Sequence, residues 1–183
     1  LKSWESRLMN LVVKAVETRG KAMLIRLQNG LNIYSHNQLY GRWYYCPKGV
    51  VPDTGRQLRL AIDTWDYSAY LYSASDIQVL QNSELATHPF LQKLGPDVLQ
   101  DSLDTRQVLA RLESKSYCRR CLGNFLTDQS FMAGLGNYLR CEILFAAKIH
   151  PSTRPVDLSK AQLNALASAI LSLPWQSYES GGI

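Results

Sequence analysis

The sequence lacks the features that mark several classes of protein. No apolar run approaches the roughly 18 residues that a membrane-spanning helix needs, and no signal peptide opens the chain. Its 4 cysteines in 183 residues are too few for a disulfide scaffold. Hydrophobic residues make up 46% of the chain, which excludes disorder. We therefore expect a globular protein of a reducing, cytoplasmic compartment, with free thiols and no membrane partner.

Both ends lack what a complete chain usually has. Residue 1 is leucine rather than methionine, and the last four residues, Ser-Gly-Gly-Ile, close no recognisable element. We therefore expect a fragment that is cut at both ends.

The net charge of +5 conceals an uneven distribution. Residues 1–50 carry 8 basic and 2 acidic side chains, residues 51–113 carry 5 and 9, and residues 114–183 carry 7 and 4. Two basic segments that flank an acidic one suit a polyanion held between two surfaces. Ordinary solubility charge explains the same numbers, so the charge alone decides nothing.

The first half of the chain has the pattern of short β-strands. Asn29-Gly30 stands between two apolar runs, which predicts a tight hairpin, because both turn residues must adopt positive φ. Alternation farther on places Leu58, Leu60 and Ile62 on one face of a strand. The predicted strands cover residues 21–28, 31–36, 42–46, 57–64 and 69–73.

The second half has the pattern of helices. Asp104 or Thr105 is expected to cap a helix that runs to about residue 114, and Ser159 to cap one that ends at Pro174. An apolar segment spans 117–128, and a further helix covers 138–147. The last helix has an apolar stripe of Leu163, Leu166, Ala167, Ile170 and Leu171.

These patterns predict an α+β fold of two domains. A β-sandwich domain covers residues 1–94, a linker 95–103, and a helical domain 104–183. A cleft between two domains is the usual place for a site.

The most informative segment is the corner Gly134-Leu135-Gly136-Asn137. The two glycines allow a tight turn and a close approach of the backbone to a partner. The amides at the start of the following helix lack helical partners and favour an anion such as a phosphate. The alternative is a plain corner between helices that is capped by Asn137.

Residues 134–145 resemble the helix–two-turn–helix of the formamidopyrimidine-DNA glycosylase/endonuclease VIII family. Four other stretches agree with the family in the expected order, namely residues 16–24, 31–41, 71–77 and 88–99. The Gln-Leu-Tyr triplet at 38–40 and the Tyr-Ser-Ala-Ser-Asp run at 72–76 look like the bacterial endonuclease VIII branch.

The resemblance implies a β-sandwich domain and a helical domain with damaged double-stranded DNA across the cleft. It implies a monomeric, nucleoid-associated bacterial enzyme that removes oxidised pyrimidines and cuts the abasic strand by β,δ-elimination. The family's nucleophile is an N-terminal proline amine beside a glutamate, and its C-terminal zinc finger holds Zn²⁺. The sequence contains neither the Pro-Glu start nor the finger. As given, it is expected to be inactive and to hold no cofactor.

Lys21 matches the family's essential lysine near the abasic sugar, which implies a catalytic role for this cation. A solvent-exposed lysine at a strand edge is the alternative. His36 matches a histidine that contacts phosphate, although a buried structural histidine is nearly as well supported.

Gln38, Leu39 and Tyr40 match the loop that fills the gap left by an extruded base. Leucine provides an apolar wedge, tyrosine can stack, and glutamine can bond to a base edge. The alternative places Leu39 or Tyr40 in the core at a hairpin end.

Gly136 and Asn137 match the family's phosphate contacts. Asp97 and Asp128 match acidic family positions, and Glu142 lies within the same helix start. For all three we favour structural roles. We expect caps or hydrogen bonds for the aspartates, and stabilisation of the helix start for Glu142.

Cys118 and Cys121 form a single C-x-x-C pair, and zinc requires four ligands. We therefore predict no metal site. Arg119 and Arg120, which lie between the two cysteines, either touch the DNA backbone or form a solvated basic face.

Two functions of other classes compete with the enzyme. One is a non-catalytic DNA-binding module, since a helix–two-turn–helix alone does not make an enzyme. The other is a protein-interaction domain, which predicts no salt-dependent affinity for DNA.

Overall fold

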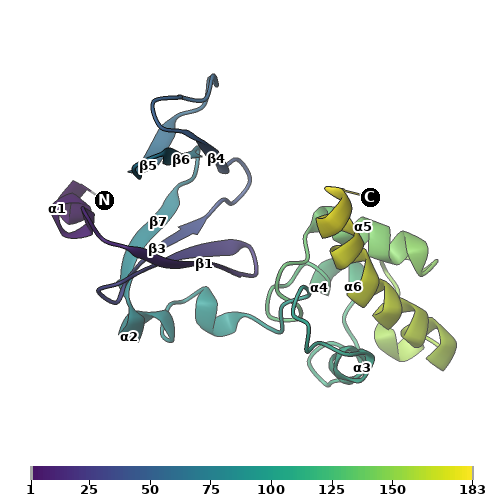
Figure 1. Cartoon of the computed structure of the whole chain (residues 1–183). Helices are drawn as coiled ribbons and strands as arrows, with labels where there is room; N and C mark the ends of the chain where they lie inside the picture. Colours follow the sequence, from purple (N-terminus) through teal and green to yellow (C-terminus); the bar gives the residue numbers. More distant parts are fainter. Residues whose placement is uncertain (1, 183) are drawn as a thin grey trace. The chain divides into compact units, whose positions relative to one another are not determined.

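The computed structural model describes residues 2–182. The chain divides into two compact units, Leu1–His88 and Pro89–Ile183 (Figure 1). The first unit is built on two antiparallel sheets and the second on helices, so the predicted α+β class is confirmed.

The first unit contains two sheets and three short helical turns. A four-stranded sheet has the order β1-β2-β3-β7, and a three-stranded sheet has the order β4-β6-β5. Its elements are η1 (Lys2–Trp4), α1 (Glu5–Leu8), β1 (Val13–Arg19), β2 (Ala22–Leu27), β3 (Leu31–His36), β4 (Arg42–Pro47), β5 (Leu58–Asp63), β6 (Tyr67–Tyr72), β7 (Asp76–Gln81) and α2 (Asn82–Leu85).

The predicted hairpin is confirmed as β2 and β3, but positive φ at both turn residues is wrong. The connection covers residues 28–30, and of its residues only Gly30 adopts positive φ, as in a three-residue hairpin loop that ends on glycine. Gly30 has φ +79°, and Ile25 pairs with Ile33 across the two strands. Buried side chains of β2 and β3 pack with partly buried ones from both sheets, such as Trp43 and Leu60. This shared apolar layer holds the two sheets together and gives the end of the hairpin a firm base.

Two features of the sheets differ from prediction. β1 and β7 were not predicted, although they flank β2 and β3 in the larger sheet. The prediction that Leu58, Leu60 and Ile62 share one face of the strand is wrong, because the pairing register with β6 shifts between Leu58 and Leu60. This irregularity turns Leu58 to the opposite face and leaves it 45% exposed.

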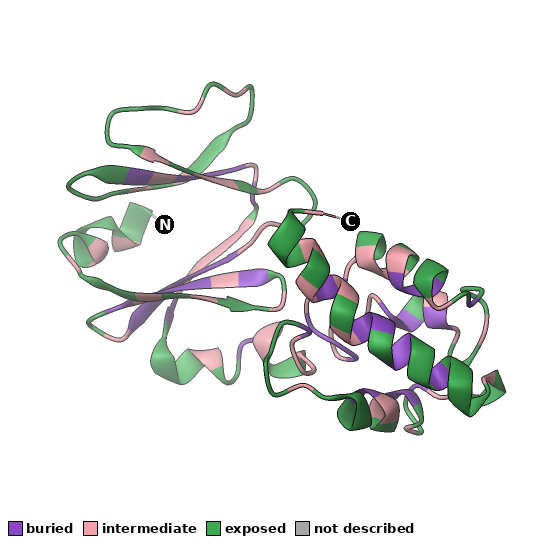
Figure 2. Ribbon diagram, turned by 45° about the vertical axis from the view of Figure 1, so that its right-hand side comes forward, coloured by how far each residue is buried: buried purple, intermediate pink, exposed green. Residues whose placement is uncertain are grey.

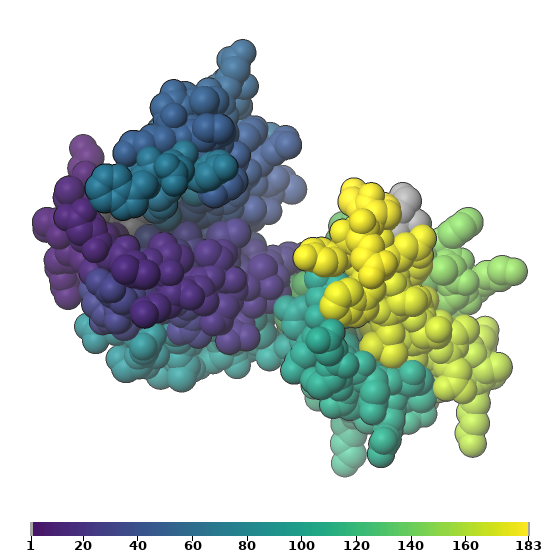
Figure 3. All heavy atoms as spheres, in the orientation of Figure 1, coloured from purple at the N-terminus to yellow at the C-terminus, as the bar shows by residue number. Residues whose placement is uncertain are grey.

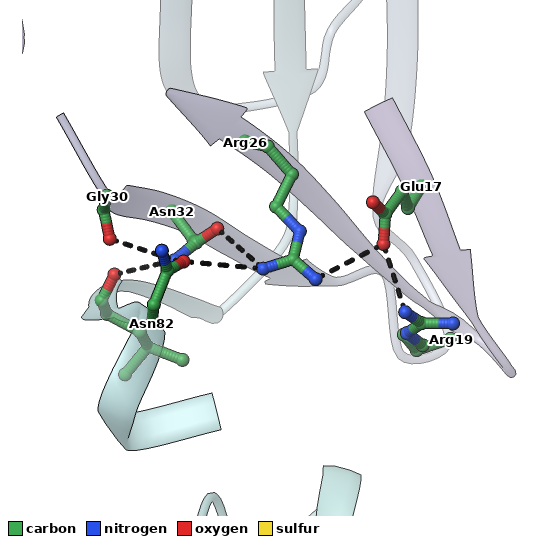
Figure 4. A network of polar contacts seen from close by, with 7 residues as sticks. Glu17, Arg19, Arg26, Gly30, Asn32 and Asn82 are labelled. Carbon is green, nitrogen blue, oxygen red and sulfur yellow. Dashed lines mark hydrogen bonds and ion pairs between the residues drawn. The ribbon is translucent and has the colours of Figure 1, made fainter. Parts of the chain in front are cut away.

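A polar network joins three strands to α2 on the outer face of the larger sheet (Figure 4). The Arg26 guanidinium lies 3.3 Å from the Glu17 carboxylate and donates to Asn32 Oδ1 at 3.2 Å and Asn82 Oδ1 at 3.4 Å. Asn32 Nδ2 also donates to Asn82 Oδ1 at 3.0 Å. The buried amide of Asn32 is thereby satisfied, and the first residue of α2 is attached to the sheet.

The second unit packs helices around an aromatic and aliphatic core. Phe125, Phe131 and Tyr117 contact one another with ring centroids 4.8 to 5.4 Å apart. Its elements are η2 (Leu91–Lys93), α3 (Thr105–Leu112), α4 (Leu122–Phe125), α5 (Asn137–Ala146), η3 (Pro155–Asp157) and α6 (Lys160–Ser180). Of the predicted apolar segment 117–128, a single turn of helix forms, namely α4.

The predicted caps of α3 and α6 are confirmed. Asp104 and Gln107 bond reciprocally at the start of α3, and Ser159 and Gln162 do so at the start of α6. Buried residues alternate with exposed ones along α6 (Figure 2), and α6 covers one face of the helical unit (Figure 3).

The expected end of the last helix at Pro174 is wrong. α6 continues to Ser180 and ends at Gly181, which has the left-handed φ of +73°. Pro174 lacks the amide that would bond to the Ile170 carbonyl, but its ring is buried. Packing of the apolar face outweighs the loss of one hydrogen bond.

Candidate nucleic-acid interface

The loop after β3 is a tight turn that projects apolar side chains. The Gly41 amide donates to the Asn37 carbonyl at 2.7 Å and closes the turn. A Cβ at Gly41 would lie 2.6 Å from that carbonyl oxygen, so only glycine fits. Gln38 adopts a left-handed φ of +51°, which reverses the chain.

Leu39 and Tyr40 stand at the tip of this turn. Leu39 is 80% exposed and Tyr40 is 67% exposed. The alternative that placed one of them in the core is therefore wrong. Two large apolar side chains exposed at the tip of a fixed turn suit contact with a partner.

Three contacts hold the turn from outside its own backbone loop. The Gln38 amide donates to His36 Nδ1 at 2.9 Å, and Ser75 Oγ donates to Gln38 Oε1 at 2.6 Å. Arg56 Nη1 donates to the Tyr40 carbonyl at 2.5 Å. Ser75 and Arg56, which are far from the turn in sequence, thus hold the Gln38 side chain and the Tyr40 carbonyl.

Lys21 and His36 lie at the same end of the larger sheet as the turn. Ala22 pairs with His36, so Lys21, one residue earlier, is beside the last residue of β3. His36 also pairs with Asp76, the first residue of β7. The sheet register therefore gathers a cation, an imidazole and a carboxylate where β3 enters the turn.

Burial lowers the pKa of both basic groups at this end of the sheet. Partial burial of the amine lowers the pKa of Lys21, although the residue as a whole is exposed. Burial also lowers the pKa of His36. The carboxylate of Asp76 opposes this shift, and the cation of Lys21 adds to it. His36 Nδ1 accepts the Gln38 amide, which leaves the proton of the neutral ring on Nε2.

Tyr34 lies directly behind this group of residues. Its ring is fully buried, and its hydroxyl donates to Asp76 Oδ2 at 3.4 Å. Burial raises the pKa of Tyr34, and the charge of Asp76 and the hydrogen bond to it add to the rise. The phenol therefore stays protonated and continues to donate to Asp76 throughout the physiological pH range.

The corner in the second unit is held by a glutamine. Gln129 Nε2 donates to the Leu135 carbonyl at 2.8 Å, and its Oε1 accepts the Gly134 amide at 3.0 Å. Gly134 has φ +98°, and a Cβ there would press on Val98 at 3.0 Å. The side chain of Gln129 thereby fixes the backbone that leads into α5.

The predicted phosphate-binding residues stand at the start of α5. Gly136 occupies the N-cap position of α5, and no side chain there bonds to the first amides of the helix. Asn137 is the first helical residue and is exposed. The alternative of an Asn137 cap is therefore wrong. Within residues 2–182, the Gly136 and Asn137 amides have no hydrogen-bond acceptor. They face outward with the positive end of the helix dipole.

The two aspartates take the structural roles expected of them. Asp128 accepts the amide and the hydroxyl of Ser130 and pairs with Arg120 at 3.2 Å. Burial of Asp128 acts to raise its pKa, but these hydrogen bonds outweigh that effect and lower it. Asp97 Oδ1 accepts the Leu99 amide at 3.0 Å.

Glu142 does not stabilise the helix start. It is the sixth residue of α5, whose first turn holds no acidic residue. The effect of the helix dipole is confined to that first turn.

No metal site forms in the described part of the chain. Between residues 2 and 182 there is no group of three histidine, cysteine or acidic side chains that could hold an ion. Cys118 and Cys121 are free thiols.

An open pocket of about 370 Å³ lies in the second unit and is lined by Cys121, Gly123, Asn124, Arg140, His150, Pro151 and Ser152.

The structure adds residues that sequence reasoning missed. Ser75 and Arg56 hold the turn from outside, and Gln129 holds the corner. For Ser75 a signal existed, because it lies in the run at 72–76 that resembles the family. Arg56 and Gln129 act on backbone groups outside their own turns, and no local pattern indicates such contacts.

No helix among residues 2–182 has the length and apolar character to cross a bilayer.

Comparisons with known structures agree with this architecture. The Lactococcus lactis Fpg in complex with DNA that contains an abasic site has a TM-score of 0.82 with 18% identity, over 100% of this chain and 66% of that one. An inhibited Fpg with DNA containing N7-benzyl-Fapy-dG has a TM-score of 0.83, again at 18% identity, over 100% and 67%. At this identity the likeness shows the fold.

Comparisons of the amino-acid sequence identify the family as well as the fold. The family model for the formamidopyrimidine-DNA glycosylase H2TH domain matches residues 94–182. Endonuclease 8 of Salmonella paratyphi B is 50% identical over 182 residues, which is 100% of this chain and 69% of that protein. Endonuclease 8 of Salmonella arizonae is 49% identical over the same shares of the two chains. With half of its residues shared along its whole length, the chain belongs to the formamidopyrimidine-DNA glycosylase/endonuclease VIII family.

Proposed function

We propose that this chain is the DNA-holding part of a base-excision-repair DNA glycosylase and abasic-site lyase that acts on oxidised pyrimidines. Family membership supports the enzyme class. The preference for pyrimidines, cleavage by β,δ-elimination and action as a monomer on damaged duplex DNA follow from the resemblance to the endonuclease VIII branch. The observation that carries the proposal is the exposed pair Leu39 and Tyr40, on the turn that follows β3 at the end of the sheet where Lys21 and His36 lie.

The turn after β3 provides the wedge. Chemistry on a base requires that its nucleotide leaves the stack, and inserted side chains offset part of the lost stacking. Leu39 and Tyr40 are already exposed and held in place, so insertion needs no large rearrangement of the loop. Gln38 adds a polar group that can bond to a base edge.

The charged and polar residues hold the backbone of the damaged strand. The Lys21 ammonium can pair with a phosphate and favour the negative charge that develops at the reacting sugar. His36, the last residue of β3, is the second candidate phosphate contact. In the second unit, the Gly136 and Asn137 amides form a further phosphate site of the kind common at helix N-termini.

The attack on the sugar is assigned to no residue of this sequence. The resemblance implies an N-terminal proline amine as the nucleophile, and the sequence contains no Pro-Glu start. The zinc implied for a C-terminal finger has no set of ligands in residues 2–182, so no step is derived through it. The non-catalytic alternative is not favoured, because the identity with Endonuclease 8 extends over the whole chain.

Binding to a defined lesion tests the proposal. The chain is titrated against a duplex with a central abasic-site analogue, the undamaged duplex and the matching single strand. We expect tighter binding to the damaged duplex. Leu39→Ala should reduce this preference about five- to thirty-fold, as expected when an apolar anchor worth about 1–2 kcal/mol is removed.

Leu58→Ala is the matched control, because it truncates an exposed leucine on the other sheet. It should leave binding unchanged. Equal affinity for damaged and undamaged duplexes would contradict the proposal.

A further inference from the structure

The side chain of Gln38 is fixed by a residue outside its own loop. Ser75 Oγ lies 2.6 Å from Gln38 Oε1 and donates its proton to that oxygen. Ser75 directly precedes β7, which pairs along its length with β3, the strand that leads into the turn. The hydroxyl therefore stands one residue before the paired end of β7, next to the strand pair that leads into the turn.

In this structure the oxygen end of the Gln38 carboxamide faces Ser75. A glutamine side chain has an oxygen that accepts and an NH₂ group that donates. Because the oxygen is bonded to Ser75, the NH₂ group is the end left for a partner. The main chain of Gln38 is fixed as well, since its amide bonds to His36 Nδ1 and its φ is +51°.

We propose that Ser75 is a positioning residue that makes Gln38 a hydrogen-bond donor toward the base opposite the extruded nucleotide. This inference rests on the proposed function, because it requires the turn to enter a duplex. A fixed donor bonds to ring nitrogens and carbonyl oxygens of a base and is repelled by amino and imino hydrogens. The loop would therefore rank opposite bases by the acceptor atom each one presents to Gln38.

Two neighbouring residues do not supply this ranking. Leu39 carries no polar side-chain atom, so it fills space without distinguishing one base edge from another. The guanidinium of Arg56 is engaged with the Tyr40 carbonyl and acts on the backbone. Among the side chains of residues 38–40, the Gln38 carboxamide is thus the one whose orientation is held by a residue outside the turn, Ser75.

The experiment compares binding to four duplexes that differ in the base opposite an abasic-site analogue. For the unaltered chain we expect a spread of affinities between the preferred and the least preferred base. Ser75→Ala frees the amide to present either end, so the spread should narrow about five-fold, the effect of one hydrogen bond. Ser75→Thr keeps the hydroxyl and should therefore keep the spread of affinities seen with the unaltered chain.

Two further variants separate direction from stability. Gln38→Glu keeps an oxygen for Ser75 but presents a second acceptor outward, so it should change the order of preference among the four bases. Ser83→Ala removes an exposed hydroxyl from α2 and should change nothing. Thermal melting of each variant reports on folding independently of DNA.

The outcomes distinguish this inference from the proposed function. If the unaltered chain prefers damaged duplex but binds all four opposite bases equally, or if Ser75→Ala keeps the full spread, the inference is overturned and the proposed function stands. If the chain shows no preference for the damaged duplex, the proposed function is overturned, and this inference with it.

Discussion

His36 shows how single residues set the chemistry of this surface. Its imidazole is half-buried between the Lys21 cation and the Asp76 carboxylate, and burial lowers its pKa below the usual 6.5. We therefore expect a neutral ring at pH 7, titrating below 6.5 in an NMR experiment. Asp76→Asn should lower the pKa of His36 further, and Lys21→Met should raise it.

The lowered pKa of His36 also determines whether the free energy of unfolding rises or falls with pH. The unfolded chain binds more protons than the folded one between the folded pKa of His36 and 6.5. Stability is therefore lost as pH falls through that range, and chemical denaturation at several pH values measures it. A shift of the imidazole pKa above 6.5, or opposite effects of the two variants, would contradict this account.

At the scale of elements, the turn after β3 depends on a glycine for its shape. A Cβ at Gly41 would lie 2.6 Å from the Asn37 carbonyl oxygen and 2.7 Å from Asn37 Cα, both backbone atoms that cannot move alone. Gly41→Ala should therefore open the turn at a cost of about 1–3 kcal/mol. We expect affinity for the damaged duplex to fall about ten-fold, with faster proteolysis within residues 37–41.

Gly55→Ala is the matched control for this element. Gly55 also lies in a loop of the first unit, but nothing stands within 4 Å of its added Cβ. It should bind DNA as the unaltered chain does. If both alanines behave alike, the shape of the turn is not what binding requires.

At the scale of the whole molecule, the prediction concerns charge. The basic segments 1–50 and 114–183 contain the candidate phosphate contacts, so binding should release counterions and weaken as salt increases. Fluorescence anisotropy between about 50 and 200 mM salt measures the slope of log affinity against log salt. Lys21→Ala should make that slope shallower by about 0.9, the share of one phosphate contact.

Lys48→Ala is the control, because this exposed lysine is not among the candidate phosphate contacts. It should change the slope less than Lys21→Ala does. Affinity that does not depend on salt would instead favour the protein-interaction domain, which needs no polyanion.

The amino-acid sequence by itself determined the features that short-range physics controls. The hairpin at Asn29-Gly30, the caps at Asp104 and Ser159 and the helix after Gly136 form where they were expected, although only Gly30 of the turn adopts positive φ. Each depends on residues within a few positions of one another, whose backbone preferences and hydrogen bonds act locally. The family resemblance also indicated the exposed triplet at 38–40.

Only the tertiary structure decided what depends on distant partners. The irregularity at Leu58 arises from pairing with β6, and α6 passes through Pro174 because a core covers its ring. The contacts of Ser75 and Arg56 with the turn join residues 37 and 16 positions apart. Such contacts follow from how sheets pair and pack, and no window of sequence contains both partners of the interaction.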